Sequence, residues 1–325
     1  MAQDSKDIKE TIGALDDYVL LGRSGLRVSP LCLGAMGLGS NFEESKNVFD
    51  YYYEKGGNFI DTANVYNFGE SEQFLKEYIA DKRSQVVIAT KYTLNPTAMM
   101  PNVKFNPNAG GNNRKSLVEN LNESLKRLGT GYTDILYVHA WEYNTPIEEV
   151  MRSLDDVVRS GKAFYVAASD TPTWVISCTN MLADLRGWRF LTGKYTRESI
   201  ANTKKGSNMS DYRNNSAIVF AEDEQNWKIL DEVIAIAAEI KRSPAQVTLN
   251  WISQKPGITS PIVGARTKAQ LVENLKALEF KLTPEQMARL DAVSAPKHIP
   301  FPYSYVSTLR NIVNKGMGLQ YKGIH

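Results

Sequence analysis

Four residues of types that transfer protons or stabilise charge follow short apolar runs in the first half of the chain. Asp61 ends one such run, and Tyr66 comes five residues later. Lys91 directly follows the next run, and His139 ends the one after it. A serine and an aspartate at 169–170 end a fifth run. A single titratable residue in such a place is typical of an ordinary surface loop, but the succession predicts one shared site for proton transfer.

The apolar runs alternate with longer amphipathic segments, which predicts parallel strands joined by helices. We expect strands at 30–34, 58–62, 86–90, 134–139 and 163–168. We expect helices at 43–56, 70–81, 114–128 and 173–186, and a further helix beginning at the predicted capping box Thr145-Pro146-Ile147-Glu148.

Two folds fit this alternation, a doubly wound sheet and a (β/α)8 barrel. A doubly wound dinucleotide fold would carry G-x-G-x-x-G directly after its first strand. The turn at 34–39 reads Gly-Ala-Met-Gly-Leu-Gly, which has the wrong spacing. We therefore expect the barrel, in which reactive side chains gather at the C-terminal ends of the strands.

The composition is that of a soluble globular protein. The chain has 325 residues, of which 42% are apolar and 23% charged, and its net charge is only +2. This balance indicates neither a nucleic-acid partner nor a membrane partner. The two cysteines form no metal-binding or disulfide pattern, so we expect no metal and a reducing, cytoplasmic location. We expect one domain over 1–325 with a flexible extension at 1–17 and a tail at 296–325, and no feature indicates an oligomeric state.

Several longer segments of the sequence resemble the aldo-keto reductase superfamily. The resemblance is to the branch that contains potassium-channel β-subunit-like and aryl-alcohol-dehydrogenase-like members. The similar segments are 21–39, 59–75, 89–92, 114–142, 161–175, 191–195 and 261–275. The resemblance implies a (β/α)8 barrel with an N-terminal β-hairpin. It also implies an NADPH-dependent enzyme that transfers a hydride to an aldehyde or ketone, or oxidises an alcohol in the reverse direction.

The resemblance assigns catalytic roles to the four residues of the predicted site. Tyr66 matches the family's proton donor and Lys91 the lysine that lowers the pKa of that tyrosine. Asp61 matches the carboxylate that pairs with the lysine, and His139 the imidazole that orients the carbonyl. These roles are physically reasonable, because an unperturbed tyrosine has a pKa of about 10 and a nearby ammonium stabilises its anion. A Tyr66 hydroxyl and a His139 N–H could both stabilise the negative charge that develops on a carbonyl oxygen.

The resemblance also places NADPH contacts in the segment after the last predicted strand. Gly264 and Ala265 match backbone that approaches the cofactor, and a helix N-terminus there favours an anion. Arg266 matches the family's partner of the 2′-phosphate, and a guanidinium is well suited to binding a phosphate. Gln270 and Asn274, one turn apart, match adenine contacts. The same stretch is also typical of an ordinary helix capped by the threonine before it.

Further contacts are expected at the other end of the cofactor and around the carbonyl substrate. Ser169 and Asp170 match the family's Ser-Asn pair that holds the carboxamide, although Asp170 lacks the donor of an asparagine. Met36, Tyr92 and Trp141 are candidates for an apolar substrate pocket, and ordinary core packing is the competing interpretation for each of them.

The sequence departs from the family after residue 170. No convincing strand is found at 170–260, and Trp188-Arg189-Phe190 leads directly into the motif Leu191–Tyr195. We therefore expect strands six and seven to be missing, a loss of about 35–45 residues at barrel averages. The expected losses are a glutamine for the carboxamide, an aromatic side chain stacked on the nicotinamide, and a loop for the pyrophosphate.

Three explanations of this deletion remain open. It could be an artefact such as a skipped exon, an isoform that folds poorly because strands five and eight have unpaired edges, or a degenerate protein that binds partners. The intact flanking motifs favour the first. Besides the reductase, the alternatives are a catalytically impaired NADP-binding or channel-regulatory protein and a truncated non-functional product.

Overall fold

The computed structural model describes residues 13–99, 102–185 and 224–295. These residues fall into two compact units, which are described separately. The first contains 13–99, 102–185 and 237–282, and the second contains 224–236 and 283–295. The predicted tail at 296–325 and the motif at 191–195 lie outside the described residues.

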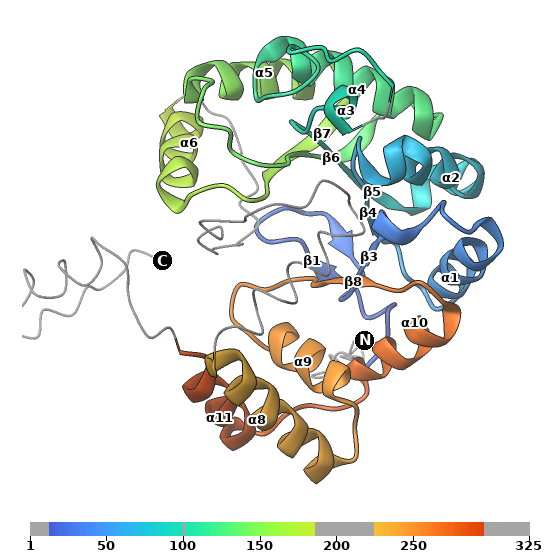
Figure 1. Cartoon of the computed structure of the whole chain (residues 1–325), viewed down its shortest axis with the longest axis vertical. Coiled ribbons are helices and arrows are strands. Elements are labelled where there is room, and N and C mark those ends of the chain that lie inside the picture. The colour runs from blue at the N-terminus through green and yellow to red at the C-terminus, as the bar shows by residue number, and fades with distance from the viewer. Residues whose placement is uncertain (1–12, 100–101, 186–223, 296–325) are drawn as a thin grey trace, which may run out of the picture. The chain divides into compact units, whose positions relative to one another are not determined.

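A six-stranded parallel sheet forms the centre of the first unit, with the strand order β7-β6-β5-β4-β3-β8 (Figure 1). Its strands are β3 (Cys32–Gly34), β4 (Phe59–Asp61), β5 (Val87–Tyr92), β6 (Thr133–Val138), β7 (Ala163–Ala168) and β8 (Ile262–Gly264). Gly34 pairs with Asp61, and Asp61 with Ala89. This register brings the C-terminal ends of neighbouring strands to one edge of the sheet.

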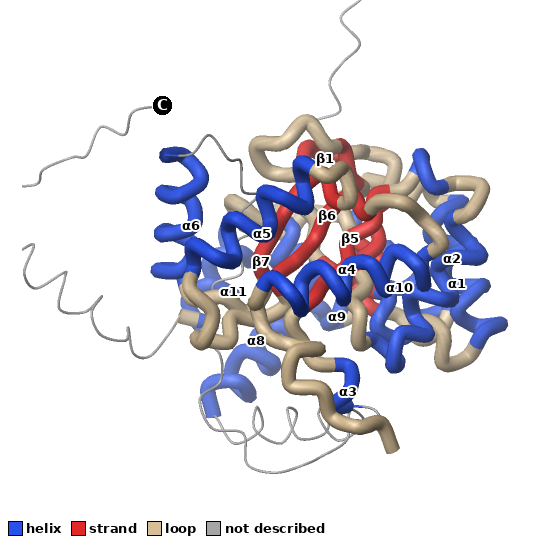
Figure 2. Tube along the Cα trace, turned by 90° about the horizontal axis from the view of Figure 1, so that it is seen from above, coloured by secondary structure: helices blue, strands red, loops and turns tan. Residues whose placement is uncertain are grey.

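Helices cover the outer face of this sheet (Figure 2). They are α1 (Phe42–Glu54), α2 (Glu70–Ile79), α4 (Arg114–Leu128), α5 (Ile147–Arg159), α6 (Thr173–Leu185), α9 (Pro244–Ser253) and α10 (Lys268–Leu275), with the single turn α3 (Pro96–Met99). Short 3-10 turns are η1 (Ala35–Gly37), η2 (Tyr66–Gly69), η3 (Arg83–Gln85) and η4 (Lys276–Leu278). Two apolar clusters fill the layer between these helices and the strands.

The opposite face of the strands carries a third cluster, which includes Phe59, Ala89 and Ile135. Side chains along a strand alternate between its two faces. Asp61 and Lys91 therefore share this inner face, because each lies two residues beyond a member of the cluster. The strand period thus places both charged groups on the side of the sheet away from the helices.

The chain before the sheet is packed against it. Strands β1 (Val19–Leu20) and β2 (Arg27–Val28) pair antiparallel. Leu15 is only 3% exposed and belongs to the cluster beneath α1. Residues 13–17 of the expected flexible extension thus include one buried apolar side chain, and its residues 1–12 lie outside the described residues.

Most expected elements agree with the structure to within a few residues, but one predicted cap is wrong. The Thr145 hydroxyl does not cap α5. It donates to Glu142 Oε1 at 2.5 Å, and Pro146 occupies the N-cap position without a side-chain hydrogen bond. The structure shows a complete capping box at Ser243 and Gln246, at the start of α9.

The fold is α/β with a parallel sheet, as expected, but the described residues do not close this sheet into a barrel. Strands β7 and β8 are its two ends and do not pair with each other. Between them in the sequence, the described residues form the helices α6, α8 (Glu224–Ile240) and α9 and no strand. The expected loss of strands six and seven also concerns 186–223, which lie outside the described residues, and it stays a prediction.

In the second unit, the part of α8 (Glu224–Ile240) that belongs to it pairs with α11 (Pro284–Ser294). Arg289 Nε donates to Glu232 Oε1 at 2.6 Å. Among the described helices of the chain, none has the length and apolar character needed to cross a membrane.

Candidate functional site

A buried ammonium lies at the centre of the candidate site, at the end of β5. Lys91 Nζ donates to Asp61 Oδ2 at 2.5 Å, to the Thr62 carbonyl at 2.8 Å and to Tyr66 Oη at 3.1 Å. The side chains of Lys91 and Asp61 are each only 5% exposed. The structure thus brings together three residues that are up to 30 positions apart in sequence, and it shields their charges from water.

His139 faces Tyr66 across the site. The two rings meet edge to face, with centroids 5.8 Å apart. Nδ1 of His139 is buried and has no hydrogen-bond partner among the described residues, and the same holds for Oδ1 of Asp61. Buried polar atoms are rarely left unpaired. These orphaned atoms beside a phenol and an ammonium mark a place suited to a polar ligand atom.

The pKa values of the site follow from burial and from the close pair of charges. Burial disfavours the ammonium, but the Asp61 carboxylate and Tyr66 outweigh it and raise the pKa of Lys91. Burial also raises the pKa of Tyr66, and the Lys91 ammonium acts in the opposite direction without cancelling that rise. Tyr66 therefore carries its proton at neutral pH, with a cation placed to stabilise the anion that remains when the proton leaves.

Burial and the nearby ammonium lower the pKa of His139 to about 3. The unfolded imidazole titrates near 6.5, so between these values the unfolded chain binds more protons and stability falls with falling pH. From pH 6.5 to 5 His139 is expected to cost about 1.6 kcal/mol of unfolding free energy, because the unfolded imidazole is only half protonated at pH 6.5 and the full slope of about 1.36 kcal/mol per pH unit is reached below it.

Urea denaturation at both pH values, for the parent and for His139→Asn, measures this contribution. The variant should lose about 1.6 kcal/mol less between the two pH values than the parent does. Equal losses in the two proteins would show that the folded imidazole titrates normally.

The residues expected to contact NADPH at α10 lie together. Gly264, Gln270 and Asn274 line an open groove with Ala269 and Glu273. A Cβ at Gly264 would meet no atom within 4 Å, so space is available for a ligand to approach this backbone. Ala265, expected to contact the cofactor, is buried in the core. The side chain of Gln270 is already bound within the chain, because its Oε1 accepts from the backbone N–H of Arg266 at 2.8 Å. The side chain of Arg266 is exposed.

Ser169 and Asp170 lie in the turn that follows β7. The Ser169 N–H donates to the Val138 carbonyl at 2.9 Å, and the Asp170 carbonyl accepts from the Trp141 N–H at 3.2 Å. Asp170 has a φ of 37°, a left-handed conformation that aspartate tolerates better than most residues. Its exposed carboxylate adds a small upward contribution to the pKa of Tyr66.

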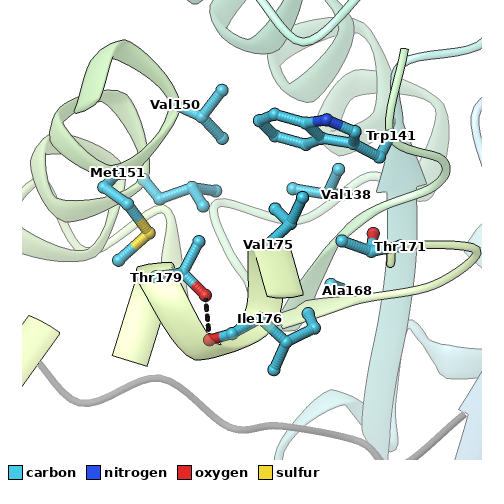
Figure 3. A pocket seen from close by; sticks show the side chains of 10 residues that line it. Val138, Trp141, Val150, Met151, Ala168, Thr171, Val175, Ile176 and Thr179 are labelled. Carbon is cyan, nitrogen blue, oxygen red and sulfur yellow. Dashed lines mark hydrogen bonds between the residues drawn. The ribbon is translucent and has the colours of Figure 1, made fainter. Parts of the chain in front are cut away.

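Two of the three residues expected at a substrate pocket lie elsewhere. Tyr92 follows Lys91 on β5, so it points to the opposite face, where it is 1% exposed in the core beneath α4 and α5. Trp141 is 8% exposed in the same core. It borders a small apolar void with residues of α5 and α6 (Figure 3). That void, of about 10 Å³, has room for about one water molecule. Met36 is half-buried in η1.

A set of buried polar residues behind the site was not predicted from the sequence. Glu72 has no exposed surface and binds Arg127 and Thr90. A signal for Glu72 was present, because it shares the buried face of α2 with Leu75 and Ile79 at positions i, i+3 and i+7. A carboxylate on such a face must have a buried partner.

The Aldo/keto reductase family profile matches this chain at residues 30–185 and 186–295, in two segments that meet between Leu185 and Arg186. Norsolorinic acid reductase of Aspergillus flavus is 30% identical, and the match covers 89% of this chain and 83% of the relative. An aryl-alcohol dehydrogenase [NADP(+)] of Phanerodontia chrysosporium is 32% identical, and the match covers 90% of each chain. An aryl-alcohol dehydrogenase of Pestalotiopsis microspora is 33% identical over 88% of this chain and 86% of its own.

The lengths of these matches bear on the expected deletion. The match to the Phanerodontia protein spans 346 aligned positions, but 90% of 325 residues is about 292, which leaves about 54 positions with no residue in this chain. The match to the Aspergillus protein spans 324 positions, of which about 289 are filled and about 35 are not. Each relative therefore has residues, about 35 in one and about 54 in the other, that have no counterpart in this chain.

Proposed function

Because the chain belongs to the Aldo/keto reductase family, in its aryl-alcohol-dehydrogenase-like branch, we propose that it reduces aldehydes or ketones with NADPH as cofactor. The observation that carries the proposal is the buried Lys91 ammonium, which contacts both Asp61 and the Tyr66 hydroxyl. A pre-formed contact of this kind suits a phenol that must give up a proton, since the charge it would leave already has a counter-ion.

In the proposed reaction the nicotinamide of NADPH supplies the hydride, and the chain supplies binding, orientation and the proton. Tyr66 donates its phenolic proton to the carbonyl oxygen as negative charge develops there. Lys91 stabilises the resulting phenolate, and Asp61 keeps Lys91 charged in spite of its burial. His139 is neutral at pH 7, so it can orient the carbonyl through an N–H without adding a charge.

The groove at α10 supports a cofactor with a phosphorylated adenosine. The exposed Arg266 has no ion-pair partner among the residues that the structure describes. A free guanidinium is suited to a bidentate contact with a 2′-phosphate. Gln270 and Asn274 lie on the groove wall, where they would contact the base.

Arg266→Gln is expected to weaken NADPH binding by about 10- to 100-fold, because a hydrogen bond to a charged group contributes about 1.5–3 kcal/mol. Binding of NADH, which lacks the 2′-phosphate, should be almost unchanged. Quenching of tryptophan fluorescence by each cofactor gives the two dissociation constants. If the variant loses affinity for both cofactors equally, Arg266 does not contact the phosphate.

For the substrate we propose carbonyls attached to or near an aromatic ring. Two of the relatives are named for aryl alcohols, and the third for norsolorinic acid. Both cysteines, Cys32 and Cys178, are free thiols, which suits the reducing cytoplasm as the place of the reaction.

A second candidate function is an NADP-binding protein without turnover. It is favoured by the 35 to 54 aligned positions that this chain lacks and by the break in the family match after Leu185. We infer that the missing positions lie at this break, where strands six and seven were expected. The groove at α10 and the charges around Lys91 are outside it, so adenosine binding would survive while the nicotinamide end lost its support.

One experiment separates the two candidates. NADPH consumption is followed with a panel of aromatic aldehydes and ketones, and NADPH binding is followed by fluorescence quenching. The reductase predicts both binding and turnover above that of Tyr66→Phe. Binding with turnover no greater than that of Tyr66→Phe would contradict the reductase and support the second candidate.

A further inference from the structure

An ion pair between a fully buried carboxylate and a partly buried guanidinium lies directly behind the candidate site, on the side of the sheet that α2 and α4 cover. Glu72, on α2, is fully buried. Its Oε2 accepts from Arg127 Nε at 2.7 Å, and its Oε1 accepts from the Thr90 hydroxyl at 2.6 Å. Both carboxylate oxygens of Glu72 therefore have a partner, Arg127 on α4 for Oε2 and Thr90 on β5 for Oε1.

Through Glu72, this ion pair contacts the strand that carries the Lys91 ammonium. Thr90 directly precedes Lys91, and its side chain points to the opposite face of β5. Its hydrogen bond to Glu72 therefore fixes β5 from behind at the position next to Lys91. A shift of β5 along α2 would break this bond and would also move the neighbouring Lys91.

Through Arg127, the ion pair contacts the turn that carries the Tyr66 phenol. Arg127 Nη2 donates to the Asn64 carbonyl at 3.5 Å, two residues before Tyr66. A Cβ at Gly69 would lie 2.9 Å from Arg127 Cδ, so the guanidinium stem packs directly on the end of the same turn. Arg127 thus contacts the chain on both sides of Tyr66.

This turn has a backbone that needs such support. Asn67 and Phe68 have φ values of 46° and 56°, in the left-handed region. A bulky residue there costs about 1–2 kcal/mol, so the conformation persists only where its surroundings hold it. The two left-handed residues come directly after Tyr66, in the same turn (η2).

We propose that Glu72 and Arg127 are positioning residues, which hold the Tyr66 turn against β5 so that the phenol stays in contact with Lys91. This inference rests on the proposed function for its effect on turnover. Stability alone is a poor explanation of the pair, since well-packed apolar residues often replace buried ion pairs without loss. A pair that fixes two reacting groups cannot be replaced so freely, because a misplacement of about 1 Å can lower a rate about 100-fold.

The test compares Glu72→Gln with Glu119→Gln in the full-length chain. Glu119 lies on α4 and pairs with Lys115 on the surface, so this control makes the same chemical change in an exposed ion pair. A second variant, Thr90→Val, removes one hydrogen bond and leaves the ion pair. It tests the positioning role if Glu72→Gln fails to fold. The readouts are kcat, KM for NADPH, and the ¹³Cζ resonance of Tyr66 in tyrosine-labelled protein, assigned by its loss in Tyr66→Phe.

The expected result for Glu72→Gln and Thr90→Val is a shifted Tyr66 resonance and a kcat at least about tenfold lower. KM for NADPH should change less than about twofold, because the groove at α10 is untouched. Glu119→Gln should change none of the three. A Tyr66 resonance that is unchanged in folded Glu72→Gln would overturn the proposal, as would a shifted resonance with normal kcat. Should the parent itself lack turnover while the resonance still shifts, the positioning role stands and the proposed function fails.

Discussion

Tyr66→Phe is expected to lower kcat/KM for aldehyde reduction by about two to four orders of magnitude, the usual contribution of a general acid. The substitution removes only the hydroxyl that lies 3.1 Å from Lys91 Nζ. The ring that meets His139 stays in place, so NADPH affinity should stay within about twofold. Initial rates and a fluorescence titration of the same preparation measure the two quantities.

Tyr137→Phe is the matched control for this prediction. Its ring lies 5.7 Å from the same ammonium, on the same inner face of the sheet. Loss of its hydroxyl should leave the rate within about tenfold of the parent, because we assign it no proton transfer. A Tyr66→Phe variant that is as active as Tyr137→Phe would place the proton donor elsewhere.

The second large effect is expected on stability. Lys91→Met removes the only cation within hydrogen-bond reach of Asp61 among the described residues. Breaking a buried pair in this way costs about 3–5 kcal/mol, because one charge is left uncompensated. Burial already raises the pKa of Asp61 despite Lys91, and Oδ1 of this carboxylate has no partner. The variant should therefore unfold at a much lower urea concentration than the parent.

The double variant Asp61→Asn/Lys91→Met tests whether the charge causes this loss. An amide needs no counter-ion, so the double variant should be more stable than Lys91→Met alone. The deficit of Lys91→Met should also shrink from pH 8 to pH 5. A carboxylic acid whose folded pKa is raised binds more protons when folded, so acid favours the folded state. A deficit that is equal in the single and double variants would attribute the loss to packing instead.

The arrangement of the site was largely predictable because strand periodicity and strand ends are local properties. The alternation of strands and helices predicted a parallel sheet. The succession from Asp61 to His139 then predicted a cluster at one end of that sheet, and the ion pair and the Tyr66 contact lie there. The period of two also predicts that Tyr92 faces away from Lys91, so its expectation as a pocket residue contradicted a pattern already in the sequence.

The remaining errors arise where a residue has two possible partners. Thr145 could cap α5 or bind Glu142, and sequence spacing does not show that the carboxylate lies within 2.5 Å. Trp141 follows His139 at an alternate position but leaves the strand, so strand period no longer decides its direction. The Glu72 and Arg127 pair joins positions 55 apart, and only the packing of α2 on α4 brings them together.

The most direct test of the central claim, hydride transfer assisted by the Tyr66 and Lys91 site, is isotopic. NADPH that carries deuterium at the transferable position of C4 is mixed with an aromatic aldehyde and the purified protein, and the alcohol is analysed by mass spectrometry. The account predicts one deuterium on the carbinol carbon with the parent and little labelled alcohol with Tyr66→Phe. Alcohol without deuterium, no alcohol from the parent, or equal labelled product from the two proteins would contradict it.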